Sequence, residues 1–397
     1  MNADRPSEPT PIVRIDALTG LRILPALVVL LSHLDAPPKS GPLLKSFLQA
    51  GYAGVTVFFV LSGFVLAHNY FERFARQFSL RLLWSYLAAR LARVYPLYLL
   101  MLVWVTLPSI ALGKTRDGLW FDHAFALQAW TGKLKNCYTF NAVGWSISVE
   151  FFLYACFPLL VPLLAPLVKT RKSALLGLGL VACGMAALTS YFVWKGYGDL
   201  KWEDPQSAHR WLYRNPACRL GDFLLGILTA RLVALQNGGP RRIHSLLLGV
   251  ATFSIVALMC WPRHNYTAPS WDVSYAVPAA LLIFALASAP HSASARLLST
   301  PPFVLLGEAS YALYLCHVYM LRHLAPGKMP PDTWLLTKTA TILMVVAVAV
   351  GLHMTIERPG RVLLRWLLDP WSRRSRRRAK AAQPEEPGQP RQLTPAS

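Results

Sequence analysis

Two side chains in the first long apolar run have the chemistry of an anion-binding group and a proton acceptor. In DALTGLRILPALVVLLSHL, Arg22 is followed eleven positions later by His33. On a helix this spacing covers about 16 Å along the axis and, being close to three turns, places both side chains on one face. A cation near one membrane edge and an imidazole deeper in the membrane could together hold one elongated substrate. The alternative is an Arg22 that extends to the interface and an unrelated interfacial His33.

A second pair of cations follows the second apolar run. Arg90 and Arg93, in RLARVYPLY, are three residues apart and share one face of a helix. Two guanidinium groups that converge suit a phosphate group, because each offers a planar fork for bidentate hydrogen bonds. A plain orientation signal of the kind found at cytoplasmic membrane borders explains the same pair equally well.

Carboxylates inside apolar runs are the third feature. Glu150 lies within GWSISVEFFLYACFPLL, with Tyr154 one turn beyond it. A carboxylate there is neutral, paired, or lines a polar cavity. It could orient an imidazole and stabilise its protonated form, or it could neutralise a buried arginine. Arg219 and Asp222, three apart, are expected to pair with each other.

Polar residues recur about every three positions in LGEASYALYLCHVYML, a pattern that gives one helix a polar stripe. Either a water-filled cavity or an interhelical hydrogen-bond network without chemistry accounts for it. The stripe consists of Glu308, Ser310, Tyr311, Tyr314 and His317.

The elements that position these residues are membrane-spanning helices. Only 15% of the 397 residues are charged and 54% are hydrophobic, whereas soluble proteins average about 25% charged residues. The sequence therefore predicts an all-α polytopic integral membrane protein. Segments of about 20 apolar residues are long enough to span a bilayer. Ten windows qualify: 18–36, 50–69, 94–112, 143–167, 173–194, 216–235, 243–261, 272–289, 302–321 and 333–355.

The chain divides into a polar N-terminal tail (1–14), a membrane domain (15–360), and a basic juxtamembrane segment with a disordered tail (361–397). With the N-terminus inside, the inner loops and both tails hold 24 Lys and Arg against 13 in the outer loops, so both termini are expected in the cytoplasm of a plasma-membrane protein. The basic run at 373–380 is expected to act as a stop-transfer and orientation signal, strengthened by attraction to anionic lipid; a nucleic-acid role is the alternative. The six scattered cysteines predict neither a disulfide framework nor a metal site.

Seven segments in order resemble the acyltransferase-3 family of bacterial membrane acyltransferases that modify carbohydrates. They are DALTGLRILPALVVLLSH, GVTVFFVLSGFVL, RLARVYPLY, WSISVEFFLYACFPLL, RLGDFLLGI, LGEASYALYLCH and IERPGR, and together they cover about residues 15–360. Ala17 and Ile23 depart from the pattern, since the family often has glycine at both positions.

The resemblance implies a ten-helix core and an acyl-CoA donor, commonly acetyl-CoA, that enters from the cytoplasm as a cosubstrate, with no permanently bound cofactor. It maps the catalytic base onto His33 and donor binding onto Arg22, Arg90 and Arg93. Glu150 is assigned to catalysis, and substrate binding is assigned to Tyr154, Tyr314 and His317. The acceptor would be a hydroxyl of a carbohydrate or glycoside. A transporter or flippase of a lipid-linked sugar or acyl group is the alternative, although no convincing internal repeat supports it.

Overall fold

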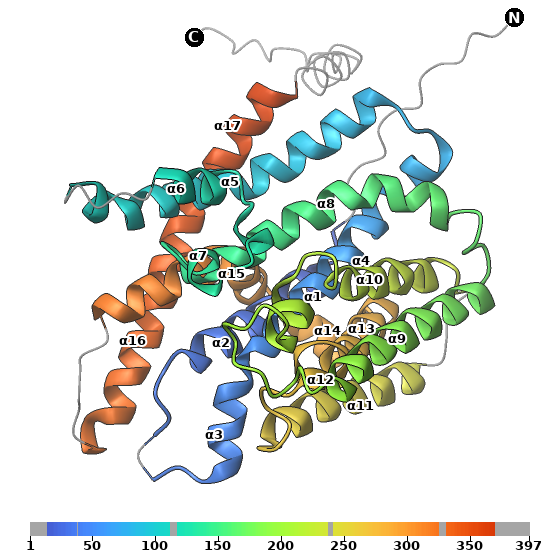
Figure 1. Cartoon of the computed structure of the whole chain (residues 1–397). Coiled ribbons are helices and arrows are strands. Elements are labelled where there is room, and N and C mark those ends of the chain that lie inside the picture. The colour runs from blue at the N-terminus through green and yellow to red at the C-terminus, as the bar shows by residue number, and fades with distance from the viewer. Residues whose placement is uncertain (1–13, 38, 112–116, 237–240, 325–330, 370–397) are drawn as a thin grey trace, which may run out of the picture.

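A computed structural model describes residues 14–37, 39–111, 117–236, 241–324 and 331–369, and these ranges form helices and no strands (Figure 1). The all-α prediction is therefore confirmed. Most of the predicted N-terminal tail and the basic run at 373–380 lie outside the described residues.

The described residues of the first half of the chain form eight α-helices with short 3₁₀ turns between some of them. The helices are α1 (Asp16–Leu21), α2 (Ile23–Ser32), α3 (Pro42–Gln49), α4 (Ala53–Arg76), α5 (Leu80–Ala111), α6 (Asp117–Ala124), α7 (Leu134–Cys137) and α8 (Trp145–Leu164). The 3₁₀ turns are η1 (Ala50–Tyr52), η2 (Gln128–Trp130) and η3 (Ala142–Gly144).

The second half continues the same pattern and adds two π-helical segments. Its helices are α9 (Arg171–Trp194), α10 (Leu220–Ala234), α11 (Arg241–Cys260), α12 (Ala268–Trp271), α13 (Val273–Ser288), α14 (Ala293–Leu298), α15 (Pro301–Leu324), α16 (Pro331–Leu352) and α17 (Arg358–Leu368). The π-helical segments are η4 (His209–Arg214) and η5 (His353–Glu357).

Eight of the ten predicted windows coincide with helices long and apolar enough to cross a membrane. The other two differ from the prediction in length. In window 216–235 the helix α10 has 15 residues, which corresponds to about 22 Å and is short for an apolar bilayer core. Window 18–36 is divided between α1 and α2 at Arg22. Within the described residues, the structure thus has eight candidate spans where ten were predicted.

Proline explains the division of the first window. Pro25 lies in the first turn of α2 and has no backbone N–H, so the carbonyl of Leu21 lacks its helical donor. The backbone of Arg22 still has helical dihedral angles, φ −58° and ψ −25°. The chain therefore keeps its direction through the break, and the two short helices together carry Arg22 and His33 along one path.

Helix α4 lies at the centre of the bundle, with 78% of its most apolar window buried, against 17% for α9 and for α11. It packs against α10 at two glycines. A Cβ atom added to Gly63 would collide with the Phe223 carbonyl, and one added to Gly226 would collide with the Val60 carbonyl. These helices touch backbone to backbone, as small residues permit in membranes.

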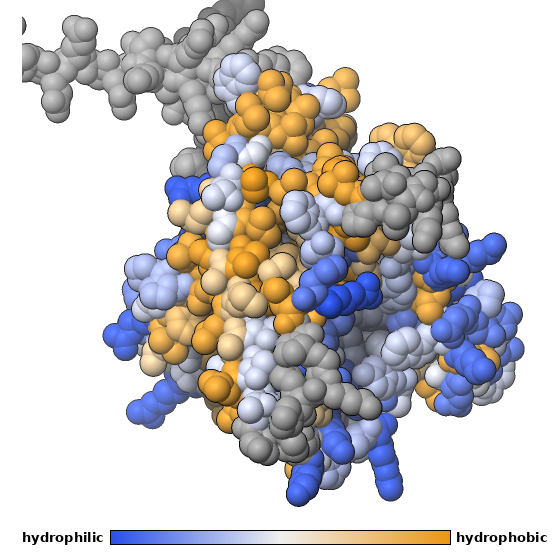
Figure 2. All heavy atoms as spheres, turned by 90° about the vertical axis from the view of Figure 1, so that its left-hand side faces the viewer, coloured by the Kyte–Doolittle hydropathy of each residue, from blue (hydrophilic) through white to orange (hydrophobic). Residues whose placement is uncertain are grey.

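Hydrophobic side chains cover the outside of the bundle. Figure 2 shows them across the middle of one face, with hydrophilic side chains toward its lower end and right-hand edge. On α16, which lies on this side of the molecule, Leu335, Leu336 and Leu343 are more than half exposed. An apolar exterior of this kind is expected for a protein whose surface faces the lipid bilayer.

Candidate active site

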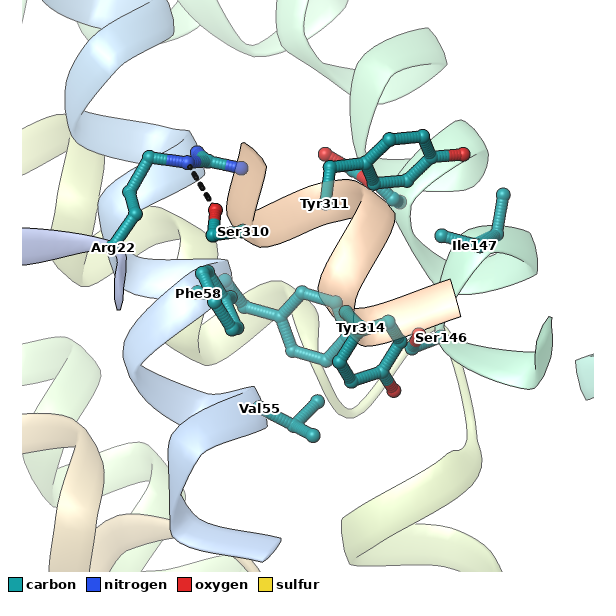
Figure 3. A pocket seen from close by; sticks show the side chains of 10 residues that line it. Arg22, Val55, Phe58, Ser146, Ile147, Ser310, Tyr311 and Tyr314 are labelled. Carbon is teal, nitrogen blue, oxygen red and sulfur yellow. Dashed lines mark hydrogen bonds between the residues drawn. The ribbon is translucent and has the colours of Figure 1, made fainter. Parts of the chain in front are cut away.

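A cavity with about 450 Å³ of empty space, its open mouth included, lies between α2, α4, α8 and α15. Its wall combines one cation, one carboxylate and several hydroxyls with apolar side chains. The lining residues are Arg22, Val55, Phe58, Phe59, Ser146, Ile147, Glu150, Ser310, Tyr311 and Tyr314. Figure 3 shows α15 crossing between the helices that carry Arg22 and Phe58 and the helix that carries Ser146 and Ile147.

Arg22 is positioned by α15. Its Nε donates a hydrogen bond to Ser310 Oγ at 3.3 Å, drawn in Figure 3, and its guanidinium carbon lies 5.4 Å from the ring centre of Phe58. The break between α1 and α2 places this cation at the cavity wall. The polar stripe on α15 therefore faces a cavity, and Ser310 is the member that contacts Arg22.

Glu150 and Arg90 meet through a tyrosine. The Tyr154 hydroxyl donates a short hydrogen bond to Glu150 Oε1, and the Arg90 guanidinium lies 5.9 Å from the Tyr154 ring centre. The rings of Tyr70 and Tyr86 also face Arg90, at 5.6 and 6.0 Å. Three aromatic faces thus stabilise this cation. The charges of Glu150 and Arg93 act on Arg22, so four charged residues of the predicted site, together with Tyr154, lie in one part of the structure.

His33 and His317 form a second group. Their rings meet edge to face with centres 4.8 Å apart. His33 Nδ1 is 2.9 Å from the Val29 carbonyl, and His317 Nδ1 is 2.7 Å from the Tyr314 carbonyl. A carbonyl only accepts hydrogen bonds, so each Nδ1 carries the proton and each Nε2 has a free lone pair. His33 is exposed, whereas His317 is buried and its Nε2 has no partner among the described residues.

An aromatic path connects the two groups. The Tyr314 ring is 6.2 Å from Phe58, which faces Arg22, and 5.9 Å from His317, which faces His33. Ser310 and His317, the contacts of Arg22 and His33, are seven residues apart on α15. Both side chains of the first predicted pair therefore point toward the same helix.

A second cavity, with about 530 Å³ of empty space, its open mouth included, has residues from the C-terminal part of α15 in its wall. It is lined by Val105, Phe140, Asn141, Ala142, Val318, Tyr319, Arg322 and His323. Val318 directly follows His317 along α15, whereas Tyr314, three residues before it, lines the first cavity. Arg322 acts electrostatically on His33. Neither His33 nor His317 lines either cavity, but His317 lies on α15 between Tyr314, which lines the first cavity, and Val318, which lines the second.

The predicted pairing of Arg219 with Asp222 is confirmed. Arg219 Nη1 lies 2.7 Å from Asp222 Oδ2, and both side chains are fully buried. Arg219 also donates to the Tyr213 carbonyl at 2.8 Å and to Thr56 Oγ1 at 3.2 Å, and its guanidinium faces the Phe59 ring at 5.5 Å. Because Phe59 lines the first cavity, this buried pair supports the wall of the site.

The segment η4 supports the start of α8 from the loop side. Its His209 stacks on Trp202 at 4.7 Å, and its Tyr213 packs on Trp145 at 4.7 Å. Burial lowers the pKa of His209 to about 3, and the positive charge of Arg214 adds to this effect. The imidazole of His209 is therefore neutral at physiological pH.

Three features of the site were not predicted as functional. Phe58 links Arg22 to Tyr314, Arg322 approaches His33, and Arg361 on α17 approaches Arg93. Arg361 ends the IERPGR segment, so its position in a recognised motif was the available signal. The sequence did not mark Phe58 or Arg322 as functional, since an aromatic residue in an apolar run and an arginine at the end of a predicted span are both common in membrane proteins.

The acyltransferase-3 family, described as an acyltransferase domain, matches residues 15–354. The chain belongs to this family. Acyltransferase MdmB from Streptomyces mycarofaciens is 31% identical over 400 aligned residues, which cover 90% of this chain and 94% of that protein. As a member of the family, the chain is a multi-pass membrane acyltransferase, which confirms the resemblance seen in the sequence.

Staphylococcal relatives are more distant and longer. O-acetyltransferase OatA from Staphylococcus aureus (strain NCTC 8325 / PS 47) is 25% identical over 83% of this chain, and this chain covers 55% of its length. The O-acetyltransferase SACOL0978 of strain COL, whose name marks its function as unproven, is 24% identical, again with 55% of its length covered. No solved structure matches this chain.

Proposed function

We propose that this acyltransferase moves an acyl group, usually acetyl, from acyl-CoA to a hydroxyl group of a carbohydrate or glycoside, with His33 as the general base. The observation that carries the proposal is the state and position of His33. Its Nδ1 is bonded to the Val29 carbonyl, no described residue bonds its Nε2, and its ring meets that of His317, which lies on α15 between residues that line the two cavities.

The donor would occupy the first cavity. Arg22 lines this cavity, the charge of Arg93 acts on Arg22, and Arg90 faces Tyr154. CoA carries several phosphate charges that guanidinium groups recognise well. The thioester arm would then extend past Phe58 and Tyr314 toward His33. This orientation places the first cavity toward the cytoplasm, consistent with cytoplasmic termini in the plasma membrane.

The acceptor would reach His33 from the second cavity. His33 Nε2 removes the proton from the acceptor hydroxyl, the oxygen bonds to the thioester carbonyl carbon, and the carbon–sulfur bond then breaks. The acylated acceptor and CoA thiolate are the products, and the proton remains on His33. An imidazole whose unperturbed pKa is near 6.5 suits this role at neutral pH.

The names of the relatives favour an enzyme that transfers acyl groups over a transporter or flippase. The family is one of acyltransferases and OatA is an O-acetyltransferase, whereas the transporter alternative would need no general base. Glu150 is proposed to act from a distance, because its described contacts are with Tyr154 and Arg22.

The proposal is tested in the host. The gene is deleted, and surface glycans and secreted glycosides are compared by mass spectrometry for a missing acyl increment. Complementation with wild type or with His291→Ala, a change at an exposed loop histidine, should restore the increment, and His33→Ala should not. Restoration by His33→Ala would refute the base assignment, and an unchanged glycan and glycoside profile after deletion would refute the acceptor class.

A further inference from the structure

Two arginines from distant parts of the chain, Arg93 on α5 and Arg361 on α17, lie close enough for their charges to interact. Helix α17 begins against α5 at Gly360, where an added Cβ atom would lie only 2.6 Å from Pro96 Cβ. This close approach requires glycine. It sets Arg361, the next residue, near enough to Arg93 for the two positive charges to repel each other.

Two carboxylates, Glu308 and Glu357, also act on Arg361, and Glu357 Oε1 has no hydrogen-bond partner among the described residues. Glu308 accepts a hydrogen bond from Arg14 Nη1 at 2.5 Å, and Glu357 Oε2 lies 2.9 Å from His353 Nδ1. Within the described ranges, neither Arg93 nor Arg361 has a carboxylate oxygen within 4.0 Å. Both side chains are half-buried. Glu308 and Glu357 offset part of the repulsion between the two arginines from a distance, and an anion bound directly between the guanidinium groups would offset more of it.

Arg93 also connects this pair to the cavity, because its charge acts on Arg22 at the cavity wall. The positive charge therefore continues from Arg361 through Arg93 to Arg22. A ligand that fits this arrangement has phosphate at one end and an uncharged arm at the other, with the arm directed along Arg22 into the cavity.

We infer that Arg361 and Arg93 together bind a phosphate group of the acyl donor, with α17 supplying the second half of the phosphate site. The inference rests on the proposed function, since it concerns the donor of that reaction. The guanidinium of Arg93 alone can donate one pair of parallel hydrogen bonds to a phosphate. A second guanidinium, that of Arg361, lets the same phosphate accept hydrogen bonds from both arginines. The chemical class required is a phosphorylated carrier thioester.

Binding of two donors to purified protein in lipid nanodiscs tests this assignment without an acceptor. Acetyl-CoA carries the phosphates, and S-acetylpantetheine carries the same thioester arm without them. We expect Arg361→Gln to raise the Kd for acetyl-CoA about 10- to 100-fold, as expected for loss of a charge-assisted hydrogen bond, and to leave the Kd for S-acetylpantetheine unchanged. An equal change for both donors would overturn the assignment.

A double substitution tests whether the two arginines hold the same group. If they do, Arg93→Gln combined with Arg361→Gln should weaken acetyl-CoA binding by less than the product of the two single effects. Simple multiplication of the effects would show that they act independently and would overturn the shared site. Arg365→Gln, one turn along the same half-exposed helix, is the matched control and should leave both Kd values unchanged.

Anionic lipid is the other source of phosphate at a membrane surface. The same binding measurements are therefore made in nanodiscs of phosphatidylcholine alone and with added phosphatidylglycerol. If lipid occupies the site, Arg361→Gln will have no effect in phosphatidylcholine, which contradicts the inference. If wild type binds acetyl-CoA and Arg361→Gln binds it equally well, this inference alone fails. If wild type does not bind acetyl-CoA, the proposed donor fails as well.

Discussion

Replacing Asp222 with asparagine removes one charge from a fully buried ion pair and leaves its shape intact. Arg219 would keep its hydrogen bonds to the Tyr213 carbonyl and Thr56, but would lose the carboxylate at 2.7 Å. Breaking a buried pair by removing one partner costs about 3–5 kcal/mol. Because asparagine still offers an oxygen to Arg219, we expect the lower end of that range.

The expected change in melting temperature follows from chain length. For large domains 1 kcal/mol corresponds to about 2 °C, so Asp222→Asn should lower the melting temperature by about 6 °C. The assay is thermal unfolding of purified protein in detergent, followed by intrinsic fluorescence. Glu72→Gln is the matched control, because Glu72 is 59% exposed in its pair with Arg231 and such pairs contribute about 0–1 kcal/mol.

A double variant separates the loss of the pair from the burial of an unpaired charge. Arg219→Met with Asp222→Leu removes both charges and should cost less than Asp222→Asn alone, since no uncompensated cation remains. Equal melting temperatures for Asp222→Asn and Glu72→Gln would refute the reasoning. So would a double variant less stable than the single one.

Three further predictions concern the site and its support. His33→Ala should lower turnover about 10²- to 10⁴-fold with unchanged acetyl-CoA affinity in nanodiscs, and full activity would refute a base at this position. Glu150→Gln should lower both turnover and melting temperature, because the charge that faces Arg22 and accepts from Tyr154 is lost; a folded and fully active variant would contradict this. His209 stays neutral in the fold while the unfolded chain takes up a proton below about pH 6.5, so stability falls as pH decreases toward 3. At pH 4.5 the free energy of unfolding is lower by about 3 kcal/mol because of His209. The melting temperature of His209→Phe should therefore depend less on pH between pH 7 and 4.5 than that of wild type. An unchanged pH dependence would refute the low pKa.

Residues close in sequence were the ones that sequence analysis could place. Helical periodicity brought Tyr154 to Glu150 and Arg219 to Asp222, and the structure has both contacts. It also predicted that Arg22 and His33 share a face, and both contact α15. These contacts follow from the regular geometry of a helix, so the spacing of the residues in the sequence is enough to predict them.

Contacts between helices that are distant in the chain could not be predicted from the sequence. His317 and His33 come from opposite ends of the chain, and Arg361 reaches Arg93 only because Gly360 lets α17 lie against Pro96. The division of the first window depended on Pro25, whose effect on one hydrogen bond changes a span into two short helices. Hydrophobicity measures composition over a window and does not register such a break.

The unequal exposure of the two histidines bears on the energetics of the membrane. His33 is exposed and His317 is buried, so under the proposed reaction a proton taken up by His33 would leave on the side from which the acceptor enters. The CoA thiolate, released on the cytoplasmic side, would take up a proton there. Each turnover of the proposed reaction would then transfer one unit of positive charge outward, against an inside-negative potential. At about 2.3 kcal/mol per 100 mV for a full charge, the membrane potential would set an upper limit on how far acylation proceeds in an energised cell.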